Sequence, residues 1–290
     1  MIWLTGCRGM LGRELALVFE REGLDFTGTG SETDITDPEA VRQFIESRRI
    51  SWIVNCSAYT AVDKAEQESE KAESINRLGV RNLALAAEKL NAKMIHFSTD
   101  YVFRGDSGNP YRETDETGPV SAYGRTKLAG EQELVSACSK YFIFRISWLY
   151  GLYGGNFVRT MLRLMNERDS LGVVCDQRGA PTYAAALADN IAMLIKSDKS
   201  DYGIYHYSDD GDISWYDFAS EIYEYGKKAG LIRKNTVISP ITSDQYQTAA
   251  VRPAMSVFNR DKVVRVLGFC IKDWKTNLHE YLERIANENL

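Results

Sequence analysis

Tyr123 and Lys127 lie four residues apart in the segment YGRTK. On a helix this spacing places both side chains on one face, so the phenol and the amine would be neighbours. A phenol has an ordinary pKa of about 10 and is a poor acid at neutral pH unless a nearby cation favours its ionised form. Lys127 is a candidate for that cation. Because Tyr-x-x-x-Lys is common by chance, an exposed tyrosine beside a solvated lysine is the alternative interpretation.

Two hydroxyl groups follow a predicted strand at residues 93–98, in the segment STDYVF that begins at Ser98. In a parallel sheet, ligands bind outside the carboxyl ends of the strands. Ser98 or Thr99 would therefore be placed to hydrogen-bond a carbonyl oxygen. The alternative is that both hydroxyls only cap the strand or the turn after it.

Glycines recur every third residue at Gly6, Gly9 and Gly12, between a predicted strand at 2–5 and a predicted helix from Leu11. Glycine permits a tight turn and a close approach of backbone to a pyrophosphate. The start of the helix adds free N–H groups and a partial positive charge. In this context the spacing predicts dinucleotide binding.

Small residues follow the third predicted strand in the segment NCSAYTAVDKAE, residues 55–66. They would allow a cofactor to approach the backbone at the same sheet edge. Asp63 and Glu66 either face that ligand or are ordinary acids in the first turn of a helix. The sequence leaves both interpretations open.

The elements that must position these residues alternate in type along the first half. The pattern predicts an α/β fold, a doubly wound parallel sheet of the Rossmann kind, because apolar strands alternate with amphipathic helices. We expect a dinucleotide-binding domain at 1–150 and a smaller substrate-binding lobe at 151–290, with some segments of the lobe returning to the first domain. We expect the second half to lose the alternation and to contain two helical stretches. Predicted strands are 2–5, 26–29, 52–55, 93–98 and 141–147, and predicted helices include 11–19, 38–45, 66–90, 157–168 and 215–226.

Composition excludes several classes of protein. The 290 residues carry a net charge of −5, which gives no global reason to bind nucleic acid or an anionic membrane. No apolar run approaches the roughly 18 residues of a membrane helix, and no basic segment precedes the start MIWLTG. Five cysteines without a CxxC pair argue against disulfides or a zinc site, and we expect a cytoplasmic protein without a metal. The cysteines are Cys7, Cys56, Cys138, Cys175 and Cys270.

Taken together, these segments resemble the dTDP-4-dehydrorhamnose reductase family of the extended short-chain dehydrogenase/reductase superfamily. The superfamily landmarks are TGxxGxxG, a Ser or Thr after the fourth strand, and YxxxK. The resemblance extends to both halves of the chain. The matching stretches are NCSAYTAVDKAE, FSTDYVF, YGRTKLAGE, FRISWLYG, DQRGAPT, GIYHYS and RPAMS.

The resemblance implies reduction of the C4 keto group of a dTDP-4-dehydro-6-deoxy sugar by a nicotinamide cofactor, completing dTDP-L-rhamnose. Thr99, Tyr123 and Lys127 would be catalytic, with Tyr123 as proton donor and Lys127 also bonded to the nicotinamide ribose. On the substrate side it implies Thr99, Trp148 and Arg252, although Trp148 is equally well read as a core aromatic residue. We expect cofactor contacts from Gly6, Arg8, Gly9, Met10, Leu11, Gly12, Ser31, Ala58, Tyr59, Tyr123 and Lys127.

The end of the second predicted strand bears on the choice of cofactor. NAD-preferring enzymes commonly have an acid there for the ribose 2′-hydroxyl, whereas this chain reads GTGSE at 28–32. Arg8 would offset a 2′-phosphate. We therefore expect NADPH, with NADH as the alternative if Glu32 bends back.

Two other functions remain open at this stage. One is a nucleotide-sugar epimerase or dehydratase on the same fold, although the acid pair that dehydratases commonly carry beside the threonine is missing, since Asp100 is followed by Tyr101. The other is a non-catalytic subunit like the regulatory subunit of methionine adenosyltransferase. Some relatives form metal-bridged dimers, and Glu14 is a conceivable ligand without identifiable partners. A homodimer therefore stays an open alternative, with no metal expected.

Overall fold

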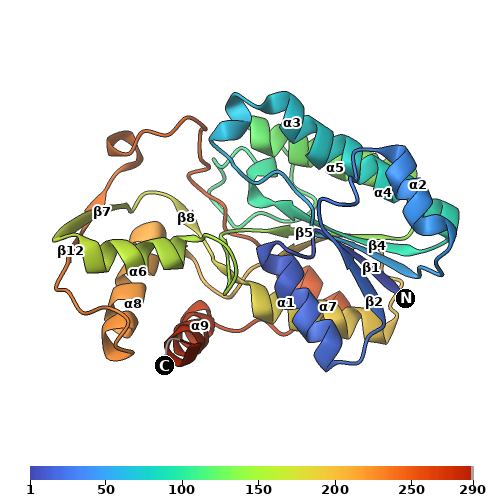
Figure 1. The fold of residues 1–290 in the computed structure, drawn as a ribbon. Helices are drawn as coiled ribbons and strands as arrows, with labels where there is room; N and C mark the ends of the chain where they lie inside the picture. Colours follow the sequence, from blue (N-terminus) through green and yellow to red (C-terminus); the bar gives the residue numbers. More distant parts are fainter. Residues whose placement is uncertain (289–290) are drawn as a thin grey trace.

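A computed structural model describes residues 1–288 of the chain, without the side chain of Glu288. Its centre is a six-stranded sheet in the order β10-β5-β4-β3-β1-β2, in which all neighbouring strands are parallel (Figure 1). This confirms the predicted doubly wound α/β fold. The strands are β1 Ile2–Thr5, β2 Phe26–Thr29, β3 Trp52–Asn55, β4 Lys93–Thr99, β5 Tyr141–Ile146 and β10 Gly203–Tyr207.

Helices cover both faces of this sheet (Figure 1). Successive residues of a strand point to opposite faces, so Ile2 and Leu4 pack with α1 and α7, whereas Trp3 packs on the other face against α2, α4 and α5. Strands buried on both faces read as continuous apolar runs, as in the fully buried WIVN of β3. The helices are α1 Met10–Arg21, α2 Pro38–Glu46, α4 Val80–Leu90, α5 Ala122–Ala137 and α7 Ala184–Ser197.

The expected loss of alternation after residue 151 is wrong over residues 184–207. There α7 and β10 add another helix–strand unit to the sheet, with β10 beside β5. The sequence AAALADNIAMLIKS of α7 buries residues around most of its circumference against the sheet and α1. Only a narrow stripe of the helix, with Asp189, Met193 and Lys196, is exposed, so the amphipathic spacing is weak and the pattern was missed.

The predicted helix at 66–90 is interrupted. A 3₁₀ turn η1 (Lys64–Glu66) leads to α3 (Ser69–Glu73), and a π-helical turn η2 (Ser74–Gly79) then joins α3 to α4. The π turn admits an extra residue into the helix, and such insertions are frequent at functional sites. Here it brings Asn76 inward, where the side chain is fully buried.

The remaining elements form a second region around an aromatic core, seen at the left of Figure 1. Tyr150, Tyr183, Phe218 and Tyr281 contact one another there through stacked and edge-on rings. The strands are short and pair across long loops, and residues 274–288 form a further helix that the sequence did not predict. The elements are β6 Leu149–Tyr150, α6 Phe157–Glu167, β7 Ser170–Val174, β8 Arg178–Gly179, β9 Thr182–Tyr183, β11 Ile213–Ser214, α8 Trp215–Lys228, β12 Val237–Ile241, η4 Ser243–Gln245 and α9 Trp274–Glu288. The π turn η5 (Val263–Leu267) instead returns to the central sheet and packs with β10 and α7.

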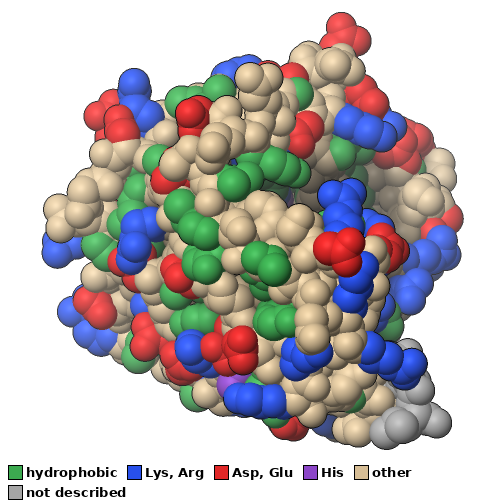
Figure 2. All heavy atoms as spheres, turned by 90° about the vertical axis from the view of Figure 1, so that its left-hand side faces the viewer, with side chains coloured by type: hydrophobic (Ala, Val, Ile, Leu, Met, Phe, Trp, Pro, Cys, Tyr) green, Lys and Arg blue, Asp and Glu red, His purple; other side chains and the backbone are tan. Residues whose placement is uncertain are grey.

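The outer face of this second region carries charges of both signs among hydrophobic side chains, as Figure 2 shows. Within residues 1–288, no helix has the length and apolar character needed to cross a bilayer.

Candidate active site

The glycine loop joins β1 to α1, and two of its glycines are required by close contacts. Gly6 has a left-handed φ of +64°, and a Cβ there would lie 2.6 Å from the backbone nitrogen of Ser57. A Cβ on Gly12 would lie 2.2 Å from the carbonyl oxygen of Gly6. Any side chain at these positions would displace the loop, so the spacing reflects how tightly the loop packs on itself and on the loop after β3.

Gly9 is different, because it faces open space. A Cβ on it would meet only the Gly6 carbonyl oxygen, at 3.3 Å. Gly9 precedes the first turn of α1, and no side chain caps that turn. The N–H groups of Met10, Leu11 and Gly12 therefore have no intrahelical partner and can bind an anion.

The segment after β2 lies beside this loop. Glu32 bends back, and its carboxylate accepts a hydrogen bond of 2.7 Å from the N–H of Gly30 and pairs with Arg8 at 3.1 Å. The N–H of Gly30, then the N–H of Glu32 itself and the charge of Arg8, lower the pKa of Glu32. Ser31 is exposed next to it. Glu32 therefore bends back toward the end of β2, the condition under which the sequence kept NADH as the alternative cofactor.

Tyr123 and Lys127 lie on α5, as the spacing predicted, and both are buried. Ser121 begins the helix by accepting the N–H of Gly124. The Lys127 amine donates to the carbonyl oxygen of Phe97 at 2.6 Å and lies 3.4 Å from Nε2 of His96. Burial lowers the pKa of Lys127 to about 8, and Glu131 and Cys56 act in the opposite direction.

Thr99 is the last residue of β4 and lies beside Tyr123. Its hydroxyl donates to Asp100 Oδ1 at 2.9 Å and accepts the N–H of Tyr101 at the start of the 3₁₀ turn η3 (Asp100–Val102), so the capping interpretation of Thr99 also holds. Burial raises the pKa of Asp100 to about 6. Burial also raises the pKa of Tyr123 well above its ordinary value, and the Thr99 hydroxyl partly offsets this.

The loop after β3 is held by Asn76 of the π turn. The amide of Asn76 accepts the N–H of Tyr59 at 2.9 Å and donates to its carbonyl oxygen at 3.1 Å. Tyr59 and the half-buried Ala58 are fixed in this way on the loop whose Cys56 and Ser57 pack against Gly6. The sequence analysis did not identify Asn76, because no pattern in the neighbouring residues predicts a π turn.

Across from the sheet, Trp148 stacks on Trp215 with ring centroids 3.6 Å apart. Trp148 has a left-handed φ of +48°, a conformation that costs free energy in a non-glycine residue and is found at functional sites. Both tryptophans are half-buried rather than fully in the core. Trp215 was not predicted to take part, because it lies 67 residues from Trp148.

Arg252 forms a two-armed ion pair with Asp63, with nitrogen–oxygen distances of 3.1 and 3.0 Å. Asp63 also accepts the N–H of Ala250 at 3.1 Å. The second acid in that segment, Glu66, accepts the N–H of Ala122 at the start of α5. Both carboxylates therefore join separate segments, and Asp63 is not an isolated first-turn acid.

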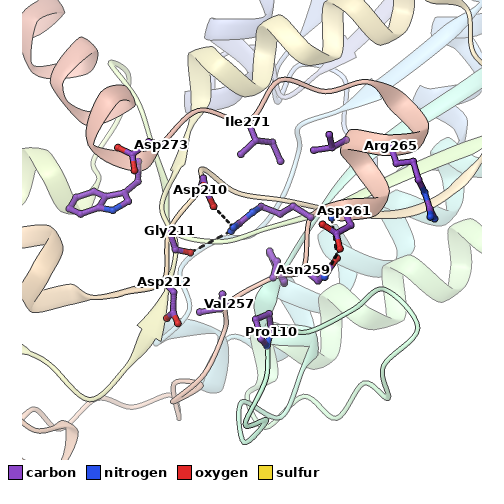
Figure 3. Close-up of a pocket in the computed structure, with 14 residues that line it drawn as sticks. Pro110, Asp210, Gly211, Asp212, Val257, Asn259, Asp261, Arg265, Ile271 and Asp273 are labelled. Atoms are coloured by element: carbon purple, nitrogen blue, oxygen red, sulfur yellow. Dashed lines mark hydrogen bonds and ion pairs between the residues drawn. The ribbon is translucent and has the colours of Figure 1, made fainter.

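A pocket of about 970 Å³ opens elsewhere, next to the loop after β10 (Figure 3). None of Thr99, Tyr123 and Lys127 lines it. Arg260 is already bonded there to Asp210 and to the Gly211 carbonyl oxygen. The pocket has more acidic than basic side chains, and the excess negative charge disfavours binding of a nucleotide diphosphate. The charged lining residues are Asp210, Asp212, Asp261, Asp273, Arg260 and Arg265.

Comparisons with known proteins bear directly on this arrangement. The family model described as "RmlD substrate binding domain" matches residues 1–287. The dTDP-4-dehydrorhamnose reductase of Escherichia coli K12 is 40% identical over 296 residues, covering 98% of this chain and 97% of that protein. The chain belongs to the dTDP-4-dehydrorhamnose reductase family. This confirms the resemblance stated from the sequence motifs.

Two solved structures of dTDP-4-dehydrorhamnose reductases have the same fold. That from Bacillus anthracis, in complex with NADP, is 39% identical with a TM-score of 0.91, and the alignment covers 98% of each chain. That from Clostridium acetobutylicum is 38% identical with a TM-score of 0.92, covering 98% of this chain and 99% of that one. The agreement over nearly the full length includes the second region.

Proposed function

We propose that this member of the dTDP-4-dehydrorhamnose reductase family reduces the C4 keto group of dTDP-4-dehydrorhamnose with NADPH, giving dTDP-L-rhamnose. The observation that carries the proposal is that Thr99 hydrogen-bonds Tyr123 on the helix that also carries Lys127, whose amine lies near Cys56 of the loop packed against Gly6. The E. coli relative's name and the NADP complex of the B. anthracis relative support it. The thiols in the described residues are free, in keeping with a reaction in the reducing cytoplasm.

The cofactor fits the residues that line the loop. Gly6 and Gly12 let the loop close on itself and on the loop after β3, and Gly9 leaves room for a diphosphate against the free N–H groups of Met10 and Leu11. Arg8 and Ser31 would face the adenosine ribose and its 2′-phosphate, and Ala58 and Tyr59 would border the adenosine half. When bound, reduced nicotinamide supplies the hydride. We therefore assign cofactor binding to residues 1–150.

Residues of α5 and of the end of β4 carry out the proton transfer. Tyr123 gives its proton to the C4 oxygen of the substrate, which Thr99 orients by a hydrogen bond. Burial opposes loss of that proton, so a positive charge on Lys127 is needed to stabilise the phenolate that remains. Lys127 also binds the nicotinamide ribose.

Residues 151–290, with Trp148 just before them, would hold the nucleotide sugar. Trp148 offers an apolar face to the sugar, and its stack on Trp215 fixes the ring plane. Arg252 would meet the diphosphate with its planar guanidinium. In the structure this guanidinium is paired with Asp63, so substrate binding would have to share or exchange that partner.

The test is NADPH oxidation with dTDP-4-dehydrorhamnose as substrate, comparing the wild type with Tyr123→Phe. This variant keeps the ring and removes only the hydroxyl, so kcat should fall by about 10²–10⁴, while the Kd for NADPH changes little. Arg125→Ala, an exposed position on the same helix, is the matched control and should stay near wild type. Retention of more than a tenth of kcat by Tyr123→Phe, with chemistry rate-limiting, would refute the mechanism.

A further inference from the structure

A row of polar side chains crosses the sheet beneath Lys127 without a part in the mechanism above. Thr5 of β1, Asn55 of β3 and His96 of β4 are paired across neighbouring strands. Each is at most 1% exposed. Buried polar groups cost free energy unless they are fully bonded, so the bonds in this row are informative about which proton each atom carries.

The orientation of the Asn55 amide is fixed by a backbone group. The N–H of Ser57 lies 3.0 Å from Asn55 Oδ1 and can only donate, so the atom facing it must be the oxygen. The Thr5 hydroxyl donates to the same oxygen at 2.7 Å. The NH₂ group of Asn55 must then point the other way, toward His96 Nδ1 at 3.0 Å.

This orientation determines the tautomer of His96. An NH₂ group only donates, so His96 Nδ1 must accept and carries no proton. The neutral ring then carries its hydrogen on Nε2, and a charged imidazolium would set two donors against each other. Burial, with the nearby Lys127 charge, also holds the pKa of His96 well below its ordinary value.

The Nε2–H of His96 faces the Lys127 amine at 3.4 Å. An ammonium group has no lone pair to accept this hydrogen, whereas an uncharged amine has one. The carbonyl oxygen of Phe97 accepts from Lys127 on another side in either state. His96 therefore discriminates between the two protonation states of Lys127, which a simple packing residue would not do.

The other charged and titratable groups around Lys127 act in the opposite direction or are already paired. Glu131, one turn along α5, favours the ammonium, but its carboxylate is bonded by Arg145 of β5 and by Ser98 of β4. Cys56, after β3, also favours the ammonium. Tyr123, one turn before Lys127, is held neutral by burial.

We propose that His96, held as its Nε2–H tautomer by Asn55, is a positioning residue that favours the uncharged amine of Lys127 until the anionic cofactor binds beside it. The inference rests on the proposed function, because it takes NADPH to bind next to Lys127. The phosphate charges of the cofactor would then restore the ammonium, the state in which Lys127 supports Tyr123. Binding of NADPH would thus take up a proton, whereas a lysine already charged would take up none.

The tautomer can be read in the wild-type protein without any substitution. Nitrogen-15 NMR of the imidazole rings distinguishes a protonated Nε2 from a protonated Nδ1, and the chain contains only three histidines to assign, His96, His206 and His279. We expect His96 to be neutral with its proton on Nε2 at neutral pH. A protonated Nδ1, or an imidazolium, would overturn the inference.

Proton uptake is measured by calorimetric titration of NADPH into the full chain, near pH 8, in buffers of different ionisation enthalpy. The wild type should take up about half a proton, because Lys127 is near its midpoint there. His96→Met keeps a similar volume but has no N–H to face the amine, so more of Lys127 is charged before binding and uptake should fall at least twofold. His206→Met, at another fully buried histidine on β10, is the control and should match the wild type.

The outcomes separate the two proposals. If the wild type does not bind NADPH, the proposed function fails. If it binds NADPH without proton uptake, or if His96→Met binds NADPH with undiminished uptake, the role of His96 is refuted while the proposed function stands. Thermal unfolding reports whether His96→Met folds. If it does not, the wild-type tautomer and uptake decide alone.

Discussion

The two sides of the site are held together by different interactions. On the sheet side, Asn55, His96 and Lys127 are buried, and each is bonded to neighbours on fixed strands. On the opposite side, Trp148 is held by a stacked ring and Arg252 by an ion pair, and both are partly exposed. Buried networks hold one geometry, whereas exposed pairs exchange partners at low cost.

This difference matches what each side has to bind. The cofactor and the proton donor need a fixed arrangement, because proton transfer depends on hydrogen-bond distances. A nucleotide sugar must enter and leave, and a side chain that exchanges one anionic partner for another allows this. We expect substitutions on the sheet side to act on chemistry and cofactor binding, and those on the opposite side to act on KM.

The largest expected effect is at Gly9. A valine fits the backbone there, since φ is −73° and only one atom lies nearby, but its side chain would fill the diphosphate position. Gly9→Val should fold and lose the NADPH-dependent rise in Tm, which at 100 times Kd corresponds to about 2.7 kcal/mol. The control is Gly155→Val in the second region, where a Cβ meets nothing. An unchanged shift in Gly9→Val would exclude the loop as the cofactor site.

Arg252 tests whether the opposite side of the site exchanges one anionic partner for another when substrate binds. If its guanidinium binds the substrate diphosphate, Arg252→Ala should raise KM by about ten- to a hundredfold, the worth of one or two charge-assisted hydrogen bonds, with a smaller change in kcat. Asp63→Asn releases Arg252 from its pair, so KM should then stay the same or fall. Should both variants raise KM equally in steady-state kinetics, the pair would only be a structural link between segments.

Asp100 tests how much folding stability is lost by burying a charged group on the sheet side of the site. Its pKa is raised to about 6 in the folded state, above the unfolded value of about 4, so stability decreases as pH rises through this interval. Asp100→Asn removes the buried charge and should stabilise the protein at pH 7.5 by up to about 3 kcal/mol. The gain should disappear below about pH 4, where both forms are neutral. Urea unfolding at several pH values measures it, and a gain that is independent of pH would contradict the assignment.

The smallest expected effect concerns cofactor preference. Glu32 and Arg8 are 48% and 68% exposed, so solvent screens their pair. Glu32→Gln leaves Arg8 free for a 2′-phosphate and should raise the preference for NADPH over NADH by a few-fold, whereas Arg8→Ala should lower it. Competing Kd measurements for the two cofactors provide the check, and no change in either variant would place the 2′-phosphate elsewhere.

Local spacing in the sequence was enough to predict the parallel fold, the glycine loop and a helix that carries both Tyr123 and Lys127. The tight turn of the glycine loop and the helix depend on contacts between residues close in the chain, such as Gly6 with Gly12. The parallel fold was predicted from the alternation of apolar strands with amphipathic helices. The segment 184–207 escaped prediction because α7 is apolar on nearly all sides, and periodicity is informative only where one face is polar.

Only the tertiary structure decided which distant groups meet. Asp63 and Arg252 are 189 residues apart, and the tautomer of His96 depends on Asn55 in another strand and on a backbone N–H at Ser57. The return of Glu32 to Gly30 depends on the conformation of the loop after β2. Residue types state which bonds a group is able to make, but buried groups bond to whatever the packed strands and loops bring within reach. The chemistry of the site was therefore predictable from motifs, and the electrostatic control of that chemistry was not.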